Sequence, residues 1–126
     1  LSDFATAGTP HLDFEGLGNL FHGTGRQRLS NMLQTLLYAM MLYRGQGTDA
    51  TPALYYVRAM HREDYSPLLV DHHDGLAGAP YSCYAGRFEE LVREALAEIY
   101  DPGVPFRQCT DPDSCQYCDF NVICKR

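Results

Sequence analysis

Tryptophan is absent from this 126-residue sequence and lysine is nearly so, because nine of the ten basic residues are arginines and Lys125 is the exception. Acidic residues outnumber basic ones, which gives a formal charge of −6. Proteins that bind nucleic acid through charge alone carry a broad basic surface, and this composition excludes one. Any contact with nucleic acid must therefore be local or depend on a larger parent protein.

Long apolar runs are missing as well. No stretch approaches the roughly 18 apolar residues that span a bilayer, so we expect no membrane partner. The opening residues, Leu1-Ser2-Asp3-Phe4, have neither the basic start nor the apolar centre of a secretory signal. We therefore expect a cytoplasmic location. Because the sequence does not begin with methionine, we expect it to be a fragment of a longer chain.

The number of apolar residues predicts one domain. At 126 residues and 45% hydrophobic content the chain can form one core but not two. We expect a single domain over residues 1–126, with a cysteine-rich C-terminal segment at residues 105–126. The five cysteines are an odd number. Without a secretory signal, they indicate reduced thiols rather than a disulfide framework.

Hydrophobic periodicity predicts two long helices. Residues 27–44 are helix formers and apolar on most sides, which is typical of a helix buried between other layers. From Phe88 to Ile99, apolar residues recur at i, i+3, i+4 and i+7 and charged residues fill the other face. This pattern predicts an amphipathic surface helix, which Asp101-Pro102-Gly103 should end.

Shorter elements complete the predicted fold. Residues 1–6, 52–58 and 68–71 read as strands, the last two as an antiparallel pair, and Asp74-Gly75 as a break. A short helical turn is expected around residues 17–21. Together these elements predict an α/β fold with a small mixed sheet flanked by helices.

One face of the first long helix is polar. Gln27, Asn31, Gln34 and Tyr38 follow one another at i, i+4, i+7 and i+11. Amide and phenol groups in an otherwise apolar helix need polar partners. The stripe therefore indicates either a structural hydrogen-bond network or a surface that faces a ligand such as a phosphate.

Four cysteines lie close together near the end of the chain: Cys109, Cys115, Cys118 and Cys124. The spacing Cys-x2-Cys-x5-Cys lets thiolates turn onto one soft metal, which suits zinc or an iron–sulfur cluster. Free, buried thiols are the alternative. Cys83 stands outside this spacing and is predicted to be a small core residue.

Other candidate metal ligands are better interpreted as surface residues. His72 and His73 are adjacent, so on a strand they point to opposite faces, and we expect a solvated turn there. Asp13 and Glu15 are weaker metal candidates in the loop before the first long helix. The isolated histidines, expected on surface loops, are His11, His22 and His61.

The order of these features resembles the PD-(D/E)XK nuclease superfamily, and most closely its RecB/AddB-type C-terminal nuclease domains. That family pairs an acidic strand, Asp-Tyr-Lys-Thr-Gly, with a helix carrying Gln-x3-Tyr and often a terminal cysteine triplet. The counterparts here are Asp3-Phe4-Ala5-Thr6-Ala7-Gly8, Gln34 with Tyr38, and the cysteines from Cys115 onward. The resemblance covers nearly the whole chain, from the D/E-x-K strand onward, and implies a partial restriction-endonuclease-like fold.

The resemblance also implies a chemistry. The parent protein would hydrolyse DNA with Mg²⁺ or Mn²⁺ in bacterial recombination or repair, beside a helicase domain or subunit. Asp3 would be a catalytic residue and metal ligand, and Gln34 and Tyr38 would belong to the active-site scaffold. Ala5 stands at the family's lysine position, so we expect the fragment alone to be inactive.

Further residues take their roles from the same resemblance. Gln27, Asn31 and Arg28 would contact DNA. Arg28 or Arg26 would supply, from another position in the chain, the positive charge of the family's lysine. In AddB-like relatives the three terminal cysteines and one far upstream bind a [4Fe-4S] cluster. Here Cys109 would be a local fourth ligand to such a cluster, or to zinc.

Two functional alternatives remain open from the sequence. The domain is either a catalytically inactive nuclease-like scaffold whose Gln34/Tyr38 face holds DNA or a partner subunit, or a metal-stapled interaction module. Replacing Gln34 would impair DNA handling in a nuclease or scaffold and have no effect in the module.

Overall fold

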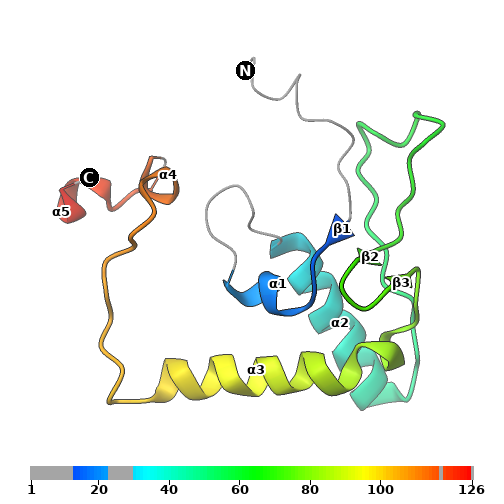
Figure 1. Cartoon of the computed structure of the whole chain (residues 1–126), viewed down its shortest axis with the longest axis horizontal. Helices are drawn as coiled ribbons and strands as arrows, with labels where there is room; N and C mark the ends of the chain where they lie inside the picture. Colours follow the sequence, from blue (N-terminus) through cyan, green and yellow to red (C-terminus); the bar gives the residue numbers. More distant parts are fainter. Residues whose placement is uncertain (1–12, 23–29, 117, 126) are drawn as a thin grey trace.

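The computed structural model describes residues 13–22, 30–116 and 118–125. In Figure 1, α2 runs obliquely between a small sheet and α3, while α4 and α5 lie apart at the end of an extended segment. Within the described ranges no helix is long and apolar enough to cross a membrane. The elements are β1 (Asp13–Phe14), α1 (Gly18–His22), α2 (Ser30–Gln46), β2 (Val70–Asp71), β3 (Leu76–Ala77), the 3-10 helix η2 (Tyr81–Cys83), α3 (Ala85–Tyr100), α4 (Pro112–Cys115) and α5 (Asn121–Cys124).

The sheet has the order β1-β2-β3 and mixes both strand directions. β1 pairs with β2 in parallel, and β2 pairs with β3 antiparallel. The turn between β2 and β3 passes through Gly75, whose φ of 66° suits a residue without a side chain. The expected combination of helices with a small sheet is confirmed. The strand expected over residues 1–6 lies outside the described residues.

The strand predicted over residues 52–58 is wrong. One isolated bridge joins Ala53 to Leu68, and beyond it the chain turns, with Ala59 N–H donating to the Tyr56 carbonyl at 2.8 Å. The physical reason is Tyr65, whose hydroxyl accepts from Tyr56 N–H and donates to the Leu54 carbonyl, both at 2.7 Å. A side chain thus occupies the place of a neighbouring strand. We call residues 54–66 the arm; Figure 1 draws it in green.

The core lies where α1, α2, η2 and α3 meet. Leu36, Tyr81 and Phe88 have no exposed surface. Phe88 packs against two other rings, with centroids 5.8 Å from Phe21 and 6.2 Å from Tyr81. Such edge and tilted contacts add to the stabilisation from apolar burial.

α2 is not buried between layers, contrary to the sequence-based expectation. Its buried residues are Met32, Leu36 and Ala39, while Tyr38 is 57% exposed and Met41 64% exposed. Apolar composition predicts that a helix can be buried on several sides, but the neighbouring elements cover one side here. The opposite side of α2 is therefore an accessible surface.

The amphipathic helix is confirmed as α3, which ends at Tyr100 just before Asp101 as predicted. Its first half buries Ala85, Phe88 and Leu91. The short helix expected around residues 17–21 is confirmed as α1.

An ion pair joins the two long helices. Arg44 Nε and Nη2 donate to the two carboxylate oxygens of Glu89, each at 2.8 Å. The Glu89 side chain is 11% exposed, and the Tyr81 hydroxyl reaches the same carboxylate at 3.4 Å. Arg44 holds the pKa of Glu89 below the ordinary value of 4.5, mainly through its hydrogen bond and also through its positive charge. Burial raises the pKa of Tyr81 to about 12.

Glu89→Gln should lower the free energy of unfolding at pH 7 by about 1 kcal/mol, since it removes a charge-assisted bidentate contact. A lowered folded-state pKa means that the carboxylate stabilises the fold above the unfolded-state value of 4.5 and loses this effect as pH falls through the folded-state value. The free energies of unfolding measured in urea should therefore differ more between the variant and the wild type at pH 7 than at pH 3. Glu90→Gln, which alters an exposed i,i+3 pair, is the control.

Candidate functional site

The exposed face of α2 carries a hydrogen-bonded amide–phenol pair. Gln34 Nε2 donates to the Tyr38 hydroxyl at 2.8 Å, which the i,i+4 spacing on a helix permits. Both side chains are exposed. Because the Tyr38 oxygen accepts from Gln34, its own proton is still available to another acceptor. A phosphate oxygen is such an acceptor.

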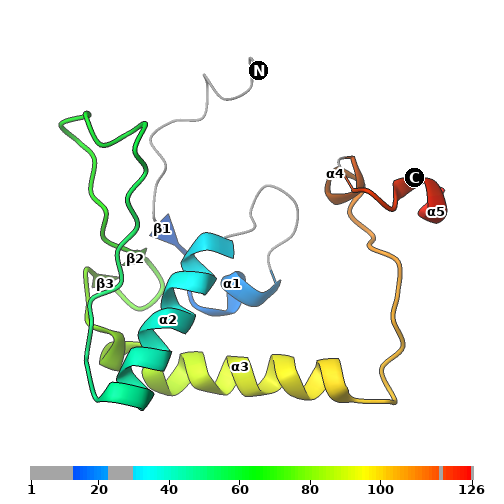
Figure 2. The same cartoon turned by 180° about the vertical axis from the view of Figure 1, so that it is seen from behind.

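Asn31 extends this face toward the arm. Its Nδ2 donates to the Tyr56 hydroxyl at 3.4 Å, and Thr35 Oγ1 donates to the Asn31 carbonyl at 2.8 Å. The arm exposes Tyr55 to 66% and also carries the exposed Arg58. In both views the arm extends past the amino-terminal end of α2 (Figure 2). The pair on α2 and the arm thus form one polar and aromatic surface.

A fully buried carboxylate fixes the turns beside the sheet. Asp71 Oδ1 accepts the backbone N–H groups of Gly16 at 3.1 Å, His73 at 2.9 Å and Asp74 at 3.3 Å. These bonds tie the loop after β1 to the turn between β2 and β3. The pKa of Tyr84 is raised mainly by burial and to a smaller extent by the negative charge of Asp71.

From the sequence, Asp71 was expected at the solvated end of the strand over residues 68–71, and its burial was not predicted, although a signal was present. An aspartate shortly before Asp74-Gly75 is typical of a turn in which the carboxylate accepts backbone N–H groups. The three bonds to Oδ1 give Asp71 a structural role, while its Oδ2 is buried without a hydrogen-bond partner among the described residues.

Several predicted site residues lie outside the described part of the chain: Asp3, Ala5, Gln27, Arg26 and Arg28. Asp13 lies in β1 rather than in a loop, and Glu15 is exposed just after it. In the residues that the structure describes, no three His, Cys, Asp or Glu side chains form a group that could hold a metal ion. These residues by themselves do not fit a Mg²⁺ or Mn²⁺ site, and the role of Asp3 stays a prediction.

The histidines behave as surface residues. His72 and His73 are exposed in the turn after β2, as expected. His73 Nδ1 lies 2.8 Å from an oxygen of Asp74, and this hydrogen bond raises the pKa of His73. His22 and His61 are exposed as well, and His11 lies outside the described residues.

The cysteine-rich segment is locally ordered, and its described cysteines do not come together as a group of metal ligands. The sulfurs of Cys109 and Cys115 both lie 3.7 Å from the carbonyl oxygen of Asp111. Gln108 Nε2 donates to the Cys124 carbonyl at 2.6 Å and so brings the two ends of the segment together. None of the described cysteines is in a disulfide. Metal binding by this segment stays a prediction.

The prediction that Cys83 is a core residue is wrong. Cys83 is exposed, because η2 turns Tyr81 and Tyr84 toward the core and leaves Cys83 outside.

A family model described as the PD-(D/E)XK nuclease superfamily matches residues 22–125. The match covers most of the chain, including α2 with Gln34 and Tyr38, α3 and the cysteine-rich segment, and begins after Asp3 and Ala5. No curated protein and no solved structure matches the chain.

Proposed function

Because the chain belongs to the PD-(D/E)XK nuclease superfamily, we propose that it is the C-terminal part of a RecB/AddB-like nuclease domain with a restriction-endonuclease-like fold. Family membership suggests nuclease-type activity with DNA as the substrate. The single observation that carries the proposal is the Gln34–Tyr38 pair, which lies inside the matched range on an exposed helix face. The parent protein would act in recombination or repair beside a helicase domain or subunit.

The pair would contact the DNA backbone. The Gln34 amide orients the Tyr38 hydroxyl, and a fixed hydroxyl donor loses less freedom when it binds a phosphate oxygen. Arg58 is exposed on the neighbouring arm and adds a local positive charge. This local arrangement agrees with a chain whose overall charge is −6.

In this proposal other residues of the chain act together with the rest of the parent protein. Asp3 would be one carboxylate ligand of Mg²⁺ or Mn²⁺, and the metal ion would polarise the scissile phosphate. Gln27, Asn31 and Arg28 would contact DNA. Ala5 provides no charge where the family has a lysine, so hydrolysis requires a cation from elsewhere.

Gln34→Ala in the full-length parent should weaken binding of linear DNA by about tenfold, because it removes the group that orients Tyr38. Fluorescence anisotropy with labelled single- and double-stranded DNA measures this. Gln46→Ala is the matched control, since it removes an exposed amide at the other end of the same helix. Equal losses in both variants would contradict a specific role for the pair.

Hydrolysis is tested by measuring cleavage of the same linear DNA in Mg²⁺ and in Mn²⁺. The wild-type parent is compared with its Ala5→Lys variant. Cleavage by the wild type would mean that another residue replaces the lysine. Cleavage only by Ala5→Lys would identify a degenerate site on an intact scaffold. DNA binding without cleavage in either would overturn hydrolysis and leave the inactive scaffold.

The proposal extends to the cysteine-rich segment. In the parent, Cys115, Cys118 and Cys124 would bind a [4Fe-4S] cluster or, alternatively, zinc, with Cys109 or an upstream cysteine as the fourth ligand. We expect Cys118→Ser to lose the iron or zinc measured in the anaerobically purified parent, and Cys83→Ser to retain it. A metal-free wild type would contradict this part.

A further inference from the structure

The apolar face of α3 continues beyond the core that covers it. Phe88 and Leu91 are buried, but Ile99, further along the same face, is 66% exposed. Ala95, between them, is half-buried. The periodicity that buries the first half of α3 therefore presents a second apolar surface in the last two turns.

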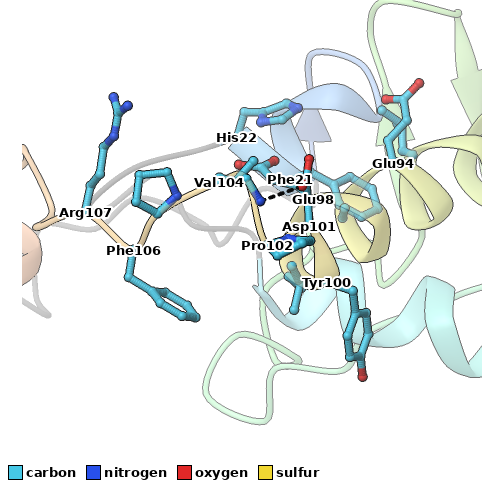
Figure 3. A pocket seen from close by; sticks show the side chains of 15 residues that line it. Phe21, His22, Glu94, Glu98, Tyr100, Asp101, Pro102, Val104, Phe106 and Arg107 are labelled. Atoms are coloured by element: carbon cyan, nitrogen blue, oxygen red, sulfur yellow. Dashed lines mark hydrogen bonds between the residues drawn. The ribbon is translucent and has the colours of Figure 1, made fainter.

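This surface lies in a groove of about 1260 Å³ between α1, the second half of α3 and the segment that follows. Figure 3 shows Phe21 of α1 on one side and Val104 and Phe106 of the following segment on the other. Val104 is 45% exposed and Phe106 is completely exposed. Apolar side chains gathered in an open groove are typical of an interaction site.

The rim of the groove is negatively charged. It carries the carboxylates of Glu94, Glu98 and Asp101 against one arginine, Arg107, and one histidine, His22. Outside the groove lining, Arg87 Nη1 lies 3.9 Å from Glu94 Oε1. These charges repel the phosphates of DNA and of acidic membranes, so the groove is distinct from the polar face of α2.

The same charges restrict which protein can bind. A second copy of the chain docked through this groove would bring the same three carboxylates together, at an electrostatic cost. A helix with apolar side chains on one face and Lys or Arg beside them would instead cover the groove and neutralise its rim. We propose that the groove binds such a basic amphipathic helix of a protein partner, as in other helix-in-groove complexes.

The test uses the full chain and a labelled, designed helical peptide of leucine and lysine, followed by fluorescence anisotropy. We expect saturable binding, and at least tenfold weaker binding of a matched peptide with glutamate in place of lysine. Ile99→Ser should raise Kd about tenfold, because it removes an exposed apolar anchor without disturbing the core. Glu94→Gln/Glu98→Gln should raise Kd and reduce its salt dependence.

Glu90→Gln is the control, since Glu90 is an exposed carboxylate of α3 that does not line the groove. The proposal is overturned if the lysine peptide does not bind at millimolar concentration, or if Glu90→Gln weakens binding as much as the groove variants. If the chain self-associates and Ile99→Ser abolishes this self-association, the groove binds a second copy of the chain and not a partner helix. DNA binding lost in the groove variants would assign the groove to nucleic acid instead.

Discussion

Replacing Phe88 by alanine should lower the free energy of unfolding by about 3–5 kcal/mol, which is the usual cost of removing a buried aromatic side chain. Phe88 has no exposed surface and lies between Phe21 of α1 and Tyr81 of η2. The cavity left behind would separate α3 from both elements. Because small domains have about 5–15 kcal/mol of stability in total, urea unfolding should show a large shift of the midpoint.

Phe106→Ala is the matched control for this experiment. Phe106 is the same residue type but is 102% exposed, so its truncation should change stability by less than about 0.5 kcal/mol. Similar destabilisation in both variants would contradict the placement of the core around Phe88.

Asp71→Ala should be the second most destabilising of the proposed substitutions, at about 2–4 kcal/mol. It removes the oxygen that accepts from the buried N–H group of Gly16 and the partly buried N–H groups of His73 and Asp74, and leaves these donors without that acceptor. Thermal unfolding followed by circular dichroism measures the loss. We expect the loop after β1 and the turn after β2 to separate first.

Two variants sharpen the interpretation. Asp71→Asn keeps an acceptor oxygen for the same N–H groups and should recover part of the loss, although without the charge. Asp74→Asn changes an exposed carboxylate in the same turn and should have little effect. If Asp74→Asn proved as harmful as Asp71→Ala, the buried carboxylate would not be what fixes these turns.

Periodic patterns predicted the fold best. α3 could be predicted because its apolar residues recur with the period of a helix. The turn at Asp74-Gly75 could be predicted because Asp-Gly is one of the few residue pairs that favour a turn. The irregular conformation of residues 52–58, which were predicted as a strand, could not be predicted from the sequence. Their composition suits a strand, but the hydroxyl group of Tyr65, nine residues beyond Tyr56, takes the backbone partners instead.

The same distinction applies to the candidate site. The i,i+4 spacing of Gln34 and Tyr38 was enough to place them on one face, and their hydrogen bond follows from that spacing. The burial of Asp71 and the exposure of Cys83 depend on which segments pack against them, and such long-range contacts leave no local pattern. The open groove on α3 was missed for the same reason: a periodic face does not reveal how far its neighbours extend.

The closure of the arm by Tyr65 has a consequence for how the molecule responds to stress. One phenolic oxygen satisfies the backbone at Leu54 and Tyr56, where a strand would use a ladder of bonds along its length. Losing that oxygen would loosen the arm while the core around Phe88 stays packed, although the Leu54 N–H bond to the Pro67 carbonyl would still hold the base of the arm. The arm is therefore a sub-global opening unit, and its amide hydrogens should exchange with solvent well before those of the core helices.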